Sequence, residues 1–309
     1  MPILIQVLIL FIMIIIGFIA SKAKIAGQKA ADVIAPVIIK ISLPCLLIAT
    51  FQQPFSKELL GEAGIAMCAS LVMYGIAVPL AFVYPALLGI KGPERGVHRY
   101  AILFSNCGFL GYPVIAAILG ERYIFHTIIF NIGFNFFAYS LGAWVIAKEG
   151  PEKAPLDWKT FINPCVIATI TGFLLFLFSV KLPEPLYKSL KLTGDMTTPL
   201  SMLVIGINLA QVNPGQIWGK WRVYVTVCVR LFLLPLVTGL CCALAGIKGT
   251  LLALAIIIAA MPAATTTSIL SSLHKAAPGE GSTLVFISTL CSMATIPLLV
   301  LILGALKLI

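Results

Sequence analysis

The chain carries the stretch Phe104-Ser105-Asn106-Cys107-Gly108-Phe109-Leu110-Gly111-Tyr112-Pro113 inside an apolar segment that runs from Ala101 to Gly120. Two glycines and a proline weaken a helix at this point. In hydrocarbon, a backbone N–H or C=O without a partner is strongly destabilising, so a break survives only where protein or a water-filled cavity surrounds it. The stretch therefore predicts a binding site at membrane depth.

The second half of the chain carries a counterpart, Ala259-Ala260-Met261-Pro262-Ala263-Ala264-Thr265-Thr266-Thr267-Ser268. This apolar run is again interrupted by a proline and is followed by hydroxyl side chains without charge. Paired interrupted spans in corresponding places of two halves are typical of a transporter site.

The composition is that of an all-α polytopic membrane protein. Hydrophobic residues make up 60% of the chain and charged residues 10%, with a mean hydropathy of +1.08, whereas soluble domains are about 25% charged. A span needs roughly 20 apolar residues, so the chain has room for about ten helices. The expected spans are 3–20, 32–51, 61–88, 101–120, 123–147, 161–180, 186–210, 223–245, a ninth around the second break, and 283–306.

The formal charge of +10 comes from basic residues scattered through short loops, which does not form the basic face that nucleic-acid binding requires. Basic residues collect in alternate loops, around 22–29, 91–99, 148–159, 220–222 and 275. By the positive-inside rule these loops face the cytoplasm. We therefore expect a multi-pass protein of the inner (plasma) membrane with both termini outside. The apolar run that begins at Ile3 has no basic segment before it and predicts a span rather than a cleaved signal.

The eight cysteines lie in apolar segments and show neither a Cys-x-x-Cys pair nor a Cys/His spacing typical of metal ligands. We interpret them as small packing residues. The sequence therefore predicts no metal and no cofactor.

Several polar side chains lie inside expected spans. Lys40, just before Pro44, either serves function, as intramembrane cations often do, or extends to the nearer interface. Asn131 and Asn135 are four residues apart, so they share one face of a continuous helix. They either bond a neighbouring helix or line a polar cavity.

Further charges are candidates for coupling. Arg230 adds a second cation within a span, five residues before Pro235. Asp32 and Asp195 are the only acids that we expect within the spans. Both lie near expected helix starts, where N-terminal capping is favoured over a proton-coupling role. The interior is expected to be net positive.

A short recurrence suggests an internal duplication. Gly89-Ile90-Lys91-Gly92 precedes the first break and Gly246-Ile247-Lys248-Gly249 precedes the second. A repeat with five spans enters the membrane inverted in its second copy. The expected organisation is a first repeat over 1–147, a short cytoplasmic linker over 148–159, and an inverted repeat over 160–309.

The stretch from Ser105 to Pro113, the segment Lys40-Ile41-Ser42-Leu43-Pro44 and the Met261-Pro262 break resemble the auxin efflux carrier family over the full length of the chain. The short central loop resembles the compact prokaryotic branch rather than the plant PIN-formed carriers. The resemblance implies two inverted five-helix repeats and a crossing of the fourth and ninth helices at their prolines. It also implies a homodimer in which one unit moves against a scaffold of the first, second, sixth and seventh spans, as in an elevator.

The activity implied by the resemblance is export or exchange of small organic anions, such as malate, malonate or auxin-like acids. Half-helix N-termini at a crossing would attract a carboxylate. The residues that we assign to the anion site are Lys40, Ser105, Asn106, Gly108, Gly111, Pro113, Asn131, Asn135, Pro262, Ala263, Thr265 and Thr266. Lys40, Asp195 and Arg230 are candidates for charge coupling.

Three alternatives remain open. The bile-acid and sodium symporter superfamily shares the crossed architecture, but neither break holds an acidic residue for sodium. A receptor or channel on the same scaffold is a second alternative. A membrane-embedded enzyme is a third, although His98, His126 and His274 lie near loop edges without a partner constellation, and neither HExxH nor GxSxG occurs.

Overall fold

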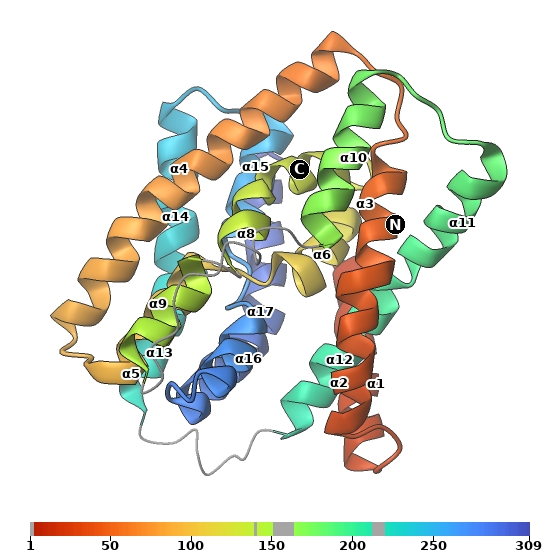
Figure 1. Ribbon diagram of the computed structural model, residues 1–309. Helices are drawn as coiled ribbons and strands as arrows, with labels where there is room; N and C mark the ends of the chain where they lie inside the picture. The colour runs from red at the N-terminus through yellow and green to blue at the C-terminus, as the bar shows by residue number, and fades with distance from the viewer. Residues whose placement is uncertain (1–2, 139–140, 151–163, 212–219) are drawn as a thin grey trace. The chain divides into compact units, whose positions relative to one another are not determined.

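The computed structural model describes residues 3–138, 141–150, 164–211 and 220–309. Within these ranges the chain is helical except for turns, short connections and one isolated β-bridge between Ser105 and Ala263. Figure 1 follows the helices from α1 near the N-terminus to α17 near the C-terminus.

The described part of the first half contains eleven helical elements. They are α1 (Ile3–Lys22), α2 (Gln28–Val37), the π-helix η1 (Ile38–Ser42), α3 (Leu43–Thr50), α4 (Lys57–Leu87), α5 (Gly92–Leu103), the π-helix η2 (Cys107–Gly111), α6 (Tyr112–Leu119), α7 (Tyr123–Phe130), α8 (Ile132–Phe137) and α9 (Leu141–Glu149).

The described part of the second half contains nine more. They are α10 (Pro164–Leu177), α11 (Glu184–Asp195), α12 (Thr197–Gln211), α13 (Trp221–Cys228), the π-helix η5 (Val229–Leu233), α14 (Leu234–Leu244), α15 (Gly249–Ala259), α16 (Thr266–Leu273) and α17 (Pro278–Ala305).

Five of these continuous helical stretches are long and apolar enough to cross a membrane: Ile3–Lys22, Gln28–Thr50, Lys57–Leu87, Trp221–Leu244 and Pro278–Ala305. Shorter apolar helices cover Cys107–Leu119, Tyr123–Phe134, Pro164–Leu177 and Gly249–Ala259. The expectation of an all-helical, polytopic membrane protein is therefore confirmed. The ten-span count, the inverted repeat and the boundaries of the two repeats stay predictions.

The π-helices η1 and η5 have a common local cause. Each is followed within two residues by a proline, Pro44 after η1 and Pro235 after η5. Proline has no N–H to donate to the preceding turn, and its ring crowds the carbonyl four residues earlier. The widened turn relieves that crowding and is a frequent feature of functional sites. Lys40 and Arg230, the cations assigned from the sequence, both lie in these widened turns.

The chain divides into two compact units, each built from both halves of the sequence. Unit 1 comprises Met1–Met67, Gly108–Asn135 and Ile162–Gln211, and unit 2 comprises Cys68–Cys107, Phe136–Phe161 and Val212–Ile309. The scaffold expected from the resemblance corresponds to α1, α2–α3, α10 and α11–α12, all in unit 1. Unit 1 also contains α6 and α7, which that expectation had placed in the moving part.

Unit 1 is held together by close backbone packing of α1 on α12, which lie side by side in Figure 1. A Cβ added at Gly206 would collide with the carbonyl oxygen of Ile14 and lie 2.7 Å from the backbone nitrogen of Phe18. A Cβ added at Gly17 would lie 2.9 Å from the Cα of Leu203. Glycine is required here because small residues let membrane helices approach at backbone distance.

The core of unit 2 lies where α5, α13, η5 and α17 meet. Its buried members are Val97, Ala101, Val223, Val227, Leu231, Ala263, Leu284 and Ile287. Ala263 is the one member that lies outside a helix, so the core packs directly against the non-helical segment after α15.

Two expected spans are interrupted in the structure. The fifth span turns at Asn131, which lies between α7 and α8, so the continuous helix that would place Asn131 and Asn135 on one face is not present. The seventh span turns at Met196, after α11. Asp195 is therefore the last residue of α11 rather than an N-terminal cap, a correction to the sequence interpretation.

Candidate functional site

The two non-helical segments of unit 2 pair with each other through their backbones. The N–H of Asn106 donates to the carbonyl of Pro262 at 2.8 Å, and the N–H of Ala264 donates to the carbonyl of Phe104 at 3.0 Å. These bonds form the antiparallel bridge between Ser105 and Ala263. Each segment thus supplies partners for polar groups that would otherwise be unsatisfied in an apolar surrounding. We call Phe104–Asn106 and Pro262–Ala264 the crossing segments.

The position of the first crossing segment corrects one expectation. The chain leaves the helix at Phe104–Asn106, whereas Pro113 lies in the first turn of α6. A proline fits there because the N–H that it lacks has no partner within the helix. The second segment contains its proline, Pro262, which follows the end of α15 at Ala259 by three residues.

Arg230 lies beside both crossing segments and is 1% exposed. Its Nε donates to the carbonyl of Met261 at 3.1 Å and its Nη1 donates to the carbonyl of Ile102 at 2.8 Å. Ile102 is in the last turn of α5, and Met261 follows the end of α15, so the guanidinium faces the negative ends of two helices. From the sequence, only helix N-termini were expected at this place.

One nitrogen of the guanidinium has its N–H groups unused. The buried Nη2 of Arg230 has no hydrogen-bond partner among the described residues. A buried charged donor without a partner is costly, and such a group in a native structure calls for an explanation. A bound anion would supply the acceptor.

Side chains around the bridge add further polar atoms. Nδ2 of Asn106 donates to Oγ1 of Thr265 at 3.2 Å. The hydroxyl of Ser288, on α17, accepts from the N–H of Ala263 at 3.1 Å. Thr266 is bonded to Tyr100 of α5 at 2.9 Å, and the buried hydroxyl of Thr267 has no partner among the described residues.

The structure therefore brings together part of the predicted set. Unit 2 gathers Ser105, Asn106, Arg230, Pro262, Ala263, Thr265 and Thr266 around the crossing segments. Unit 1 contains Lys40, Gly108, Gly111, Pro113, Asn131 and Asp195, and their membership of the same site stays a prediction. The side chain of Asn135 lies outside the described part of the structure.

Within unit 1, the predicted residues differ in their surroundings. Lys40 is exposed and forms no hydrogen bond or ion pair among the described residues. Asn131 is 2% exposed, and its Nδ2 has no partner among the same residues. The buried amide resembles Arg230 in having an unused donor, whereas the exposed lysine resembles a side chain that extends outward.

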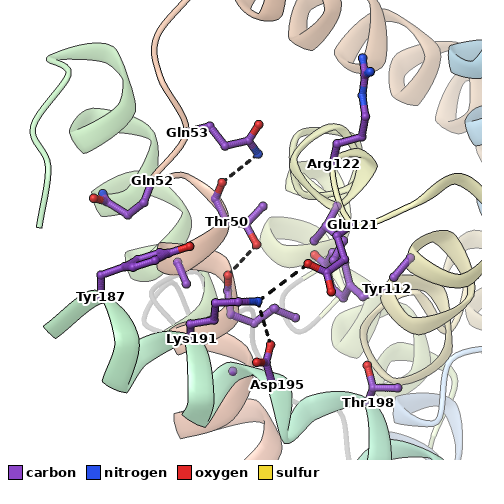
Figure 2. Close-up of a pocket in the computed structure, with 15 residues that line it drawn as sticks. Thr50, Gln52, Gln53, Tyr112, Glu121, Arg122, Tyr187, Lys191, Asp195 and Thr198 are labelled. Atoms are coloured by element: carbon purple, nitrogen blue, oxygen red, sulfur yellow. Dashed lines mark hydrogen bonds and ion pairs between the residues drawn. The ribbon is translucent and has the colours of Figure 1, made fainter. Parts of the chain in front are cut away.

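Unit 1 also contains a polar cavity of about 460 Å³, shown in Figure 2. Lys191 on α11 lies between two carboxylates, with its Nζ 3.8 Å from Glu121 and 3.5 Å from Asp195. Arg122 lines the same cavity but points away from Lys191 in Figure 2. Tyr112, directly before Pro113, also lines it.

The ion pairs in this cavity are weak anchors for a ligand. The side chain of Lys191 is 44% exposed and that of Asp195 is 51% exposed, so solvent screens the pair. The charges that line the cavity also balance, because the carboxylates of Glu121 and Asp195 accompany the cations of Arg122 and Lys191. The cavity is therefore a less selective site for an anion than the surroundings of Arg230.

Two histidine–glutamate pairs were missed from the sequence. His98 pairs with Glu280 at 3.1 Å within unit 2, and His126 pairs with Glu62 at 2.9 Å within unit 1. Both imidazoles are buried, so two of the three histidines that were expected near loop edges have a carboxylate partner. Glu62 and Glu280 also correct the expectation that Asp32 and Asp195 are the acids of the spans. An acidic residue near the start of an apolar helix was the signal available in the sequence.

Comparisons with known proteins point to transport. A family model described as membrane transport protein matches residues 2–300. An "Uncharacterized transporter" of Methanocaldococcus jannaschii is 25% identical over 94% of this chain and 96% of its own length. An "Uncharacterized transporter" of Methanothermobacter thermautotrophicus is 22% identical over 94% of this chain and 95% of its own length. A "Putative malonate transporter" of Rhizobium meliloti is 20% identical over 94% and 92%.

Proposed function

Because the chain belongs to the membrane transport protein family that includes the auxin efflux carriers, we propose that it is a secondary carrier of small organic anions. The observation that carries the proposal is the unused Nη2 donor of Arg230, buried beside the crossing segments. A carboxylate there would accept a charge-assisted hydrogen bond, which is stronger than a neutral one.

The proposed site combines the guanidinium with neutral donors. Asn106 lies in the first crossing segment, and Thr265 and Thr266 lie at the start of α16. The N-terminus of α16 adds partial positive charge. Since the described parts of the crossing segments contain no acidic residue, the site selects negative charge and does not supply carboxylate ligands for sodium.

The chemistry of the substrate follows from this set. The guanidinium of Arg230 binds one carboxylate. The amide of Asn106 and the hydroxyls of Thr265 and Thr266 suit a second oxygen-bearing group, as in a small dicarboxylate. The relative named for malonate supports malonate as the first compound to test.

Transport would proceed by alternating access of the site to the two sides of the membrane. In this proposal ten spans form two inverted repeats, over 1–147 and 160–309, and a homodimer is formed through the scaffold helices. Both termini face outward from the plasma membrane. Lys40 and Asp195, which belong to unit 1, act on the anion or on its coupling during the cycle.

A thermal-shift screen of mono- and dicarboxylates, beginning with malonate, tests binding in purified protein. A compound at 100 times its dissociation constant stabilises the fold by about 2.7 kcal/mol. Reconstituted protein should then show saturable counterflow of the labelled compound. Absence of both stabilisation and counterflow for every carboxylate in the screen would reject an organic-anion carrier.

A further inference from the structure

The buried pair of His98 and Glu280 joins α5 to α17, two helices that contact the crossing segments, and His98 lies one turn before Ile102 along α5. His98 is 0% exposed and Glu280 is 7% exposed. Nε2 of His98 lies 3.1 Å from Oε1 of Glu280, and Nδ1 lies 2.6 Å from Oγ1 of Thr226. Lys220 completes the group through a bond of 2.8 Å to Oε2 of Glu280.

The hydroxyl of Thr226 fixes the imidazole tautomer. Its single proton is donated to the carbonyl of Arg222 at 2.8 Å, because a carbonyl only accepts. The hydroxyl oxygen must then accept from Tyr84, at 3.0 Å, and from His98. Both lone pairs are used, so Nδ1 of His98 carries a hydrogen.

This assignment leaves Nε2 facing a carboxyl oxygen with one proton between them. Either His98 is an imidazolium that donates to a carboxylate, or it is a neutral ring that accepts from a carboxylic acid. Without that proton, the lone pair of Nε2 would face a charged oxygen across 3.1 Å. Removing one proton therefore converts an attraction between α5 and α17 into a repulsion.

The helices tied by this proton are those that hold the crossing segments. Along α5, His98 is one turn before Ile102, whose carbonyl binds Arg230. Thr226 is one turn before Arg230 itself, and α17 carries both Glu280 and Ser288, the acceptor for Ala263. Buried side chains of these helices, among them Val97 of α5 and Ile287 of α17, form one hydrophobic cluster. If α5 separates from α17 at His98, the packed helices would therefore transmit the movement to the crossing segments.

Other charged groups near α5 are engaged separately. Arg95 and Arg99 on α5 pair with Glu149 of α9, at 3.6 and 2.9 Å. On α13, Arg222 stacks over Trp221. Further ionisable groups on the described parts of these elements include Glu94 and Tyr100 of α5, Tyr224 of α13, Lys148 of α9, and His274 and Lys275 after α16. The contact between His98 and Glu280 is thus the buried ionisable pair that links α5 to α17.

We propose that His98 and Glu280 form a proton-binding site whose occupancy holds the crossing segments closed. The inference rests on the proposed function for its role, because it makes the proton the coupling ion of anion transport. On release, the proton leaves for solvent past Lys220, whose side chain is 32% exposed. A neutral imidazole and a carboxylate remain.

Cys107, two residues after Ser105 and 2% exposed, reports on the crossing segments without any substrate. The experiment uses the full chain in liposomes, with the other cysteines replaced by serine or alanine, and follows alkylation of Cys107 by N-ethylmaleimide as pH rises. The matched variant is Glu280→Gln, whose amide N–H donates to Nε2 while its oxygen accepts from Lys220. That variant keeps the link without a titrating proton.

The alkylation rate of the parent should rise several-fold more with pH than that of Glu280→Gln, in which only ionisation of the thiol contributes. Equal pH profiles in the two proteins would overturn the proposal. Should Glu280→Gln fail to fold, His98→Gln serves instead, because its amide donates to Glu280 and does not titrate. The alkylation rate of the parent should again rise more with pH than that of the variant, and equal pH profiles would again overturn the proposal.

The result separates the proton site from the substrate assignment. A parent protein that shows the extra pH-dependent labelling but binds no carboxylate would support the proton site and reject the anion carrier. A protein that exchanges malonate with identical labelling profiles would do the reverse.

Discussion

Asn106 and Pro262 are joined by a backbone hydrogen bond of 2.8 Å that closes the crossing of two distant segments. The side chain of Asn106 is directed to Thr265 at 3.2 Å, so one residue contributes to the frame through its backbone and to the proposed site through its amide. The two contributions are separable by mutation, because a side-chain truncation leaves the bridge in place.

Asn106→Ala should weaken binding of the anion that the screen identifies. Loss of a hydrogen bond to a charged group costs about 1.5–3 kcal/mol, which corresponds to roughly a ten- to 150-fold higher dissociation constant. Equilibrium binding by calorimetry measures the change. Thr265→Val, which removes the partner but keeps the amide, is the control and should have the smaller effect. Parent-like affinity in Asn106→Ala would place the anion elsewhere.

Arg230→Met should destabilise the fold as well as remove the proposed anion contact. The carbonyls of Ile102 and Met261 each lose a buried donor, at about 1–3 kcal/mol apiece. Thermal unfolding should therefore begin at a temperature several degrees lower. Arg230→Lys keeps the charge but lacks the planar fork that reaches two carbonyls, so it should recover stability only in part. An unchanged Tm in Arg230→Met would contradict a stabilising role for its hydrogen bonds to Ile102 and Met261.

Much of the helical framework could be predicted from the sequence. Apolar length located α1, α4 and α17 to within a few residues, and prolines and glycines marked the regions where the chain leaves the helix. The partners of Arg230 could not be predicted, because they are backbone carbonyls whose identity depends on where α5 and α15 end. The same holds for His98 and Glu280, which lie far apart in sequence. Glu280 also fell just outside the span expected to start at Thr283.

Gly206→Ala should destabilise unit 1, because the new methyl group collides with the backbone of α1 at Ile14. Overpacking of this kind costs about 1–3 kcal/mol. Gly64→Ala in α4 is the matched control, since its Cβ meets no atom within 4 Å. The control should be neutral or gain up to about 1 kcal/mol from helix propensity. The difference in Tm between the two variants measures the effect, and equal Tm values would show that α1 and α12 have room to separate.

Lys191→Gln distinguishes the cavity of Figure 2 from the crossing segments as the anion site. The pairs with Glu121 and Asp195 are solvent-screened, so we expect stability to change by less than about 1 kcal/mol and anion affinity to stay at the parent value. Binding calorimetry beside Asn106→Ala provides the comparison. A tenfold loss in Lys191→Gln alone would move the site into the cavity.

Topology can be tested with single cysteines placed at Lys24 and Gly92 in a background without the native cysteines. The basic loops predict that both positions react only with reagents that reach the cytoplasm. An impermeant maleimide applied to intact cells should label neither, and the same reagent applied to inverted vesicles should label both. Labelling of either position in intact cells would reverse the assignment of the termini.

The bridge between Ser105 and Ala263 also constrains how the protein is made. When the ribosome has completed only the first half, the polar groups of Phe104–Asn106 lack their partners, since those residues are still to be synthesised. That half must await the second in the translocon or in a water-lined assembly, because open hydrocarbon does not tolerate it. The two crossing segments therefore pair only after the second half has been synthesised. When the two halves are expressed as separate polypeptides, each should be degraded if it is produced alone, and both should persist if they are produced together.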